Sequence, residues 1–203
     1  MGRTAIAAAA QGFMTAFPDM VVTMGGAAPT HVALIRGINV GKAKRVAMAD
    51  LRALVERLGY SGARTLLNSG NLVFEAGRAA AGTVAARIEK EMTATLGVSA
   101  RVTVLTAADF ATVVEENPLG SVADNPSRLL VAFLSEPKDR IRLQPLALQT
   151  WKPEVLGLGS RAAYVWCPAG MIESPLAAAV GRVLGEATTT RNWATVTKIR
   201  ALL

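Results

Sequence analysis

RTLLNSGNLVFE, residues 64–75 of the 203-residue chain, is typical of a β-hairpin. Segments 64–68 and 72–75 have the length and composition of short strands. Ser69 and Gly70 lie between them, and a tight turn needs residues that tolerate its unusual backbone angles. We therefore predict two adjacent antiparallel strands here.

The segments on either side of the hairpin extend this pattern into a complete folding unit. Apolar residues alternate over 31–36, which predicts a strand, and recur at helical spacing over 51–58, which predicts a helix. After the hairpin we expect a helix over about 80–96 and a strand over 101–105. The order strand, helix, strand, strand, helix, strand is that of a ferredoxin-like unit.

A similar pattern begins again in the C-terminal part of the chain. A linking helix and a loop rich in proline and glycine are expected first, over 107–127. The segments that follow predict a strand, a helix, a hairpin and another helix, at 129–134, 139–149, 155–158 with 163–166, and 176–184. From about Thr190 we expect a final helix, where the first unit has a strand.

The expected fold class is therefore α+β, with two ferredoxin-like halves in tandem. They occupy residues 30–106 and 128–203, joined by the linker at 107–127, and the second half ends in a helix instead of a strand. A repeat of this kind indicates duplication within one protein.

Residues 1–29 differ in composition from the rest of the chain, because they are apolar and rich in small residues. Gln11 and Asp19 interrupt them, and no run reaches the roughly 18 to 20 apolar residues of a membrane span. We expect a disordered tail or a misassigned start, with translation from Met24, rather than an export signal. The same lack of a long apolar run predicts no membrane association. The single cysteine, Cys167, cannot form an internal disulfide, so a cytoplasmic protein is expected.

The net charge of +7 lies in two places. Segment 31–60 contributes +4 and segment 187–203 contributes +3, so the remainder is neutral in sum. Clustered positive charge favours an anionic partner, although solvated helix faces are the alternative explanation.

GINVGKAKR, residues 37–45, is a basic loop whose glycines let backbone N–H groups approach an anion. It departs from the nucleoside-triphosphatase loop, because three residues rather than four separate Gly37 from Gly41, and Ala43 follows Lys42. A looser anion site remains open, as does a loop that only turns the chain.

TTTRNWATVTK, residues 188–198, is the most informative stretch for function. Thr190 has the side chain of an N-cap, and Trp193 begins the apolar stripe of the expected helix. Arg191 would then occupy the first turn, where a cation opposes the helix dipole unless an anion lies there. The alternative is that Arg191 pairs with an acidic side chain elsewhere in the fold.

These two basic segments predict a binding module for a phosphate-bearing ligand, either a nucleotide or a nucleic-acid backbone. The candidate ligand-binding residues are Arg36, Asn39, Lys42, Lys44, Arg45, Asn68, Ser69, Asn71, Thr190, Arg191, Asn192 and Lys198. Two alternatives stay open. One is a small-molecule enzyme that orients its substrate through arginine and asparagine side chains, and the other is a scaffold or homo-oligomer without a ligand.

No catalytic constellation is recognisable in the sequence. His31 is the only histidine and lies at the edge of an expected strand, so histidine-based triads and metal sites are poorly supported. Cys167 precedes Pro168 and is expected in the core rather than as a nucleophile. We expect no metal and no cofactor, and leave open whether the protein is an enzyme.

Four tracts resemble one family. They are ALIRGINVGKAKRVAMADLRALVERLGY at 33–60, RTLLNSGNLVFEA at 64–76, ENPLG at 116–120 and TTTRNWATVTKI at 188–199. Together they resemble the family catalogued as domain of unknown function 1697, over a stretch from about Thr30 to the C-terminus. The resemblance implies a bacterial protein with a two-part ferredoxin-like α+β fold, and it carries no established activity.

Overall fold

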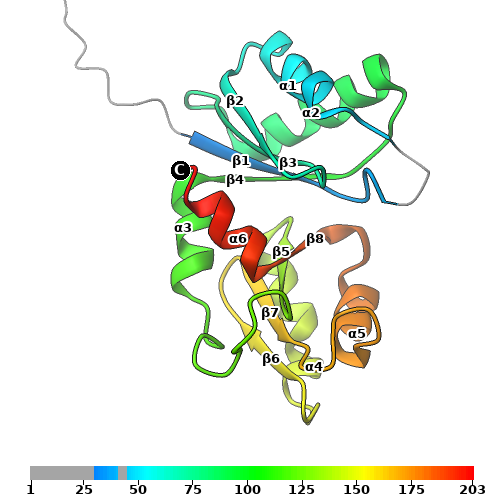
Figure 1. The fold of residues 1–203 in the computed structure, drawn as a ribbon, viewed down its shortest axis with the longest axis vertical. Coiled ribbons are helices and arrows are strands. Elements are labelled where there is room, and N and C mark those ends of the chain that lie inside the picture. Colours follow the sequence, from blue (N-terminus) through cyan, green and yellow to red (C-terminus); the bar gives the residue numbers. More distant parts are fainter. Residues whose placement is uncertain (1–29, 41–44) are drawn as a thin grey trace, which may run out of the picture.

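The computed structural model describes residues 30–40 and 45–203, and shows two four-stranded antiparallel sheets. The first half (Figure 1) orders its strands β2-β3-β1-β4. Its elements are β1 (Thr30–Ile35), α1 (Met48–Arg57), β2 (Ser61–Leu66), β3 (Asn71–Glu75), α2 (Ala81–Leu96) and β4 (Val102–Thr106). Helices α1 and α2 pack on one face of this sheet, because their buried residues join the same apolar cluster as β1 and β3. The predictions for residues 1–29 lie outside the described residues.

The second half repeats the arrangement, with strand order β6-β7-β5-β8. Its strands are β5 (Leu129–Leu134), β6 (Val155–Leu158), β7 (Ala162–Trp166) and β8 (Thr188–Asn192). Its helical segments are η1 (Pro137–Leu143), α4 (Gln144–Ala147), α5 (Pro175–Leu184), η2 (Gly185–Ala187) and α6 (Trp193–Arg200). The predicted α+β class and the two tandem halves are confirmed.

The prediction of a helix from Thr190 is wrong. Residues Thr188–Asn192 form strand β8, which pairs along its length with β5, and the Thr188 hydroxyl donates to the carbonyl of Phe133 over 2.9 Å. Pairing with β5 therefore outweighs the local preference of threonine for an N-cap. The helix begins only at Trp193, with Asn192 as N-cap. The second half thus has its fourth strand and an additional helix, not a helix in place of that strand.

The single helix expected over 139–149 is also wrong in detail. Residues Pro137–Leu143 form a 3-10 segment, and a one-turn α4 follows. Pro145 lies in the first turn of α4, where its missing N–H is tolerated, and it cannot continue a helix from the preceding turn.

Each half has an apolar cluster of its own, and the two halves share a third cluster at their junction. Helices α3 (Ala107–Glu115) and α6 lie between the sheets (Figure 1), and their apolar faces join side chains from both sheets in one cluster. Phe110 of α3 stacks on Phe133 of β5 with ring centroids 5.7 Å apart. The buried hydroxyls of Thr103 and Thr189 also lie 3.1 Å apart across the junction. This shared core fixes the position of one half against the other.

Among the described residues, no helix combines the length and the apolar character needed to cross a membrane.

Candidate functional site

A cleft of about 520 Å³ lies between the two halves. The first half contributes the chain after β1 and the hairpin turn, and the second half contributes the outer edge of β8 and one face of α5. The lining residues used below are Arg36, Ile38, Val40, Leu130, Met171, Ala177, Gly181, Thr190 and Arg191.

Arg191 extends from β8 into the first half. Its Nε donates to Asn71 Oδ1, and its Nη2 donates to the carbonyls of Ile35 and Ser69, both over 2.9 Å. Its Nη1 donates to the carbonyl of Thr190 over 2.8 Å. Burial lowers the pKa of Arg191 to about 10, so the guanidinium remains cationic at neutral pH. Within the described part of the chain no carboxylate pairs with it.

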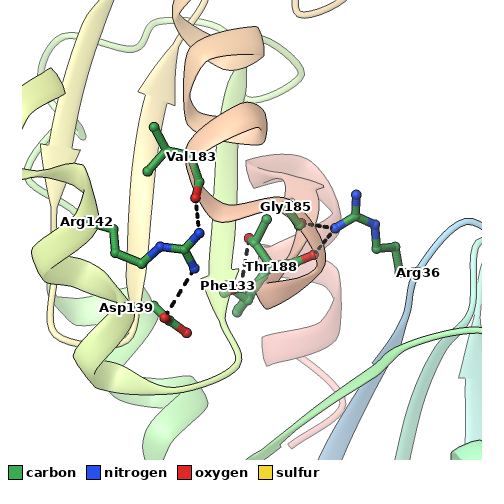
Figure 2. A network of polar contacts seen from close by, with 7 residues as sticks. All are labelled: Arg36, Phe133, Asp139, Arg142, Val183, Gly185 and Thr188. Atoms are coloured by element: carbon green, nitrogen blue, oxygen red, sulfur yellow. Dashed lines mark hydrogen bonds and ion pairs between the residues drawn. The ribbon is translucent and has the colours of Figure 1, made fainter.

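Arg36 makes the reciprocal contact from the first half. Its Nη1 donates to the carbonyls of Gly185 and Thr188, the latter over 2.9 Å, and Figure 2 shows the side chain reaching both from the end of β1. Glu186 lies 3.9 Å from Nη2 but is largely exposed, so solvent screens this ion pair. In the cleft, each half therefore contributes an arginine that donates to backbone carbonyls of the other half.

The outer edge of β8 supplies a further donor. The carbonyls of Thr188 and Thr190 accept from the two arginines, so both point away from the paired strand β5. In an antiparallel strand the N–H and C=O of one residue point to the same side. The N–H of Thr190 therefore points to the cleft side, where β8 is the edge strand of its sheet and has no neighbouring strand within the described residues.

The structure places the predicted site residues in three groups. The cleft brings together Arg36, Ser69, Thr190, Arg191 and Asn192, with Asn71 bonded to Arg191. A neighbouring hollow of about 440 Å³ is lined by Asn39, Arg45 and Asn68 among others. Lys198 is exposed on α6 and lies outside the cleft lining, while Lys42 and Lys44 lie outside the described residues.

Two of the predicted asparagines have backbone roles. Asn39, at φ +57°, donates to the carbonyls of Val46 and Asn68 and accepts from the N–H of Val46. It thereby ties the end of the basic loop to the hairpin turn. Asn192 caps α6, because its Oδ1 accepts from the N–H of Thr195 over 2.9 Å.

The prediction that Arg191 lies in the first turn of a helix is wrong, because the residue belongs to β8. The helix dipole therefore gives no argument for an anion beside Arg191. The alternative of an acidic partner also fails within the described residues, since its acceptors there are four backbone carbonyls and one amide oxygen.

Sequence reasoning missed the part of the cleft lining that α5 and the residues beside it supply. Ala177 and Gly181 lie one turn apart on α5, and Leu130 and Met171 lie beside them in the lining. The four-residue spacing of two small residues on a helix was the available signal, but small residues at this spacing are common inside alanine-rich helices.

His31 and Cys167, the two reactive side chains considered in the sequence, lie outside the cleft lining. His31 is buried on β1, with Nε2 3.2 Å from the carbonyl oxygen of Ala79 and its ring stacked on Phe74. Cys167 is buried in the second half, and burial raises the pKa of its thiol. The part of the chain that the structure describes contains no group of three histidine, cysteine or acidic residues arranged to hold a metal ion.

A comparison with solved structures supports the fold. A structure of a conserved bacterial protein from Streptococcus pneumoniae superposes with a TM-score of 0.71 at 23% sequence identity, covering 87% of this chain and 99% of that chain. A search of curated proteins gave no match. The model of the family described as protein of unknown function (DUF1697) matches residues 29–164, which is more than half of the sequence. The chain therefore belongs to the DUF1697 family.

Proposed function

We propose that the protein binds a small phosphate-bearing ligand in the cleft between its halves. The observation that carries this proposal is the guanidinium of Arg191, which borders a 520 Å³ cleft and has no carboxylate partner among the described residues. Ligand pockets of about 300 to 1,000 Å³ are usual for small molecules. A bound anion would supply Arg191 with a negatively charged partner.

The donors around the cleft suit an oxyanion. Nη1 of Arg36 donates to carbonyl groups, and the other N–H groups of this guanidinium remain available to a ligand. Nη1 of Arg191 also has a second N–H besides the one that donates to Thr190. The N–H of Thr190 points to the same cleft. Charge-assisted hydrogen bonds from arginine to phosphate are stronger than neutral ones, so these groups favour phosphate over an uncharged ligand.

A small ligand fits this position better than a nucleic-acid backbone. The donors lie in a recess between two packed halves, whereas a strand that contacts several phosphates needs an extended basic surface. Labelled single-stranded RNA is therefore expected to bind weakly, even at low salt. Tight binding of the RNA with steep salt dependence would instead support the nucleic-acid alternative.

We also propose that each half is a ferredoxin-like unit and that the two arose by duplication. The support is that the two sheets share one strand order, with the first strand of each half between its third and fourth. The second half then differs by its additional helix α6.

Inorganic phosphate should raise the melting temperature of the protein. At a phosphate concentration tenfold above Kd, binding contributes about 1.4 kcal/mol, which corresponds to roughly 3 to 5 °C for a chain of this size. Differential scanning fluorimetry at constant ionic strength measures this shift. Chloride at the same ionic strength is the control for general screening.

Arg36→Ala should weaken phosphate binding by about ten- to a hundredfold, because it removes a charged donor. Arg64→Ala is the matched control. Arg64 also bridges the halves, through a 2.7 Å bond to the carbonyl of Leu202, but it does not line the cleft. Equal loss of phosphate affinity in the two variants, or no binding by the parent protein, would contradict the proposal.

A further inference from the structure

We infer that the ligand is a nucleoside monophosphate whose base lies against helix α5. This inference rests on the proposed phosphate site and names the class of molecule that fills the rest of the cleft. It is carried by three features of the cleft, namely its volume, a lining that combines arginines with apolar side chains, and the open space at Gly181.

The cleft is much larger than a phosphate ion. An ion of five heavy atoms displaces only a few water molecules, each of which occupies about 30 Å³ in the liquid. Most of the 520 Å³ is therefore left for the remainder of the ligand. A molecule that carries one phosphate and a larger body uses this space.

Beside the arginines and the polar residues of the hairpin turn, β8 and the start of α6, the cleft has an apolar part to its lining. Ile38 and Val40 lie on the side of the first half, and Leu130, Met171 and Ala177 lie on the side of the second. An apolar wall beside a few convergent polar groups is the usual composition of a ligand pocket. Met171 also has the flexible, polarisable side chain that adapts to an aromatic ring. The body of the ligand should therefore be apolar on its faces, as a nucleobase is.

Gly181 has no structural reason to be glycine. It lies inside α5 with ordinary helical backbone, and a Cβ built on it meets no atom within 4 Å. Glycine inside a helix costs about 1 kcal/mol relative to alanine. Together with Ala177 one turn earlier, it leaves a smooth surface on the cleft side of α5. A flat ring stacked on this surface explains both small residues.

Helix α5 is held firmly enough to serve as this wall. Arg142 donates to the carbonyl of Val183 at its C-terminal end and pairs with Asp139 (Figure 2). Arg36 donates to Gly185, just beyond the helix. The distance from Ala177 to Gly185 along the helix is about 12 Å at 1.5 Å per residue. The phosphate donors of Arg36 and the apolar surface of α5 thus lie at different positions along one cleft.

Isothermal titration calorimetry with four kinds of probe tests the inference: inorganic phosphate, ribose 5-phosphate, the four ribonucleoside monophosphates, and the matching nucleosides. At least one nucleoside monophosphate should bind ten times more tightly than ribose 5-phosphate. Gly181→Leu should then weaken that nucleotide at least tenfold while changing the Kd of inorganic phosphate less than twofold. Leucine is a better helix former than glycine, so this variant should melt no lower than the parent protein.

Ala178→Leu is the matched control, because Ala178 is exposed on the same helix outside the cleft lining. It should leave all affinities unchanged. If ribose 5-phosphate binds as tightly as every nucleotide, or if Gly181→Leu does not discriminate between nucleotide and phosphate, the inference is overturned while the phosphate site stands. If no phosphate compound binds, the proposed function fails together with it.

Discussion

Arg191→Ala is expected to lower the free energy of unfolding by about 2 to 4 kcal/mol, because hydrogen bonds to charged groups contribute about 1.5 to 3 kcal/mol each and their buried partners lose them together. The partners are Asn71 Oδ1 and the carbonyls of Ile35, Ser69 and Thr190. The lower end of the range applies if water enters from the cleft and satisfies some of these groups. Urea denaturation gives the loss directly.

Two variants complete this experiment. Lys198→Ala removes a cation from the same basic segment, but Lys198 is exposed, so its loss should stay within about 0.5 kcal/mol. Arg191→Lys keeps the charge but lacks the planar fork, so it should recover less than half of the stability. If Arg191→Ala costs no more than Lys198→Ala, the arginine does not hold the halves together.

Gly70→Ala is expected to cost about 2 to 5 kcal/mol, because a left-handed backbone costs a non-glycine residue about 1 to 2 kcal/mol and overpacking adds about 1 to 3 kcal/mol. The backbone angle φ at Gly70 is +74°. An added Cβ would lie 2.8 Å from Ile38 Cδ1 and 2.9 Å from Ile35 Cβ. Both isoleucines border the cleft, so the clash reaches the candidate site itself.

Gly77→Ala separates the two penalties. Gly77 also has a positive φ, at +58°, but a Cβ there meets nothing within 4 Å. It should therefore cost only the backbone term of about 1 to 2 kcal/mol. Chemical denaturation measures the loss of unfolding free energy in both variants. Equal losses would show that the close packing of Gly70 against Ile35 and Ile38 does not constrain this position.

Local patterns in the sequence were enough to predict most of the fold. The segment 129–134 has the predicted limits of β5, and α2 begins and ends within one residue of its expected range. These elements combine a clear apolar period with clear turn residues at their ends. Local pattern and tertiary packing agree there, which is why a single sequence suffices.

Strand β8 could not be predicted in the same way. Thr188–Thr190 suit a strand and a helix cap equally, and the decision comes from pairing with β5, which lies more than 50 residues earlier. The role of Arg191 depends on this placement, because its acceptors Ile35 and Asn71 are 156 and 120 residues away. Charge clustering indicated that the arginine was special, but only the fold shows what it contacts.

Only the cationic part of the cleft could be predicted from the sequence. The two basic segments of the sequence predict ligand-binding roles for Arg36, Thr190 and Arg191, and all three line the cleft. Its apolar part includes Ala177 and Gly181, which carry no chemical signal of their own. Their position in the same cleft as the arginines is a consequence of tertiary packing alone.

The most direct test of the phosphate site is a titration of the ¹⁵N-labelled protein with inorganic phosphate, followed by amide chemical shifts. We predict saturable shifts at the backbone N–H of Thr190 and its neighbours in the cleft, Gly37 and Asn192, accompanied by shifts of the guanidinium N–H groups of Arg36 and Arg191. Shifts that stay linear in phosphate concentration and are scattered over exposed basic residues such as Arg57 and Arg200 would contradict the site.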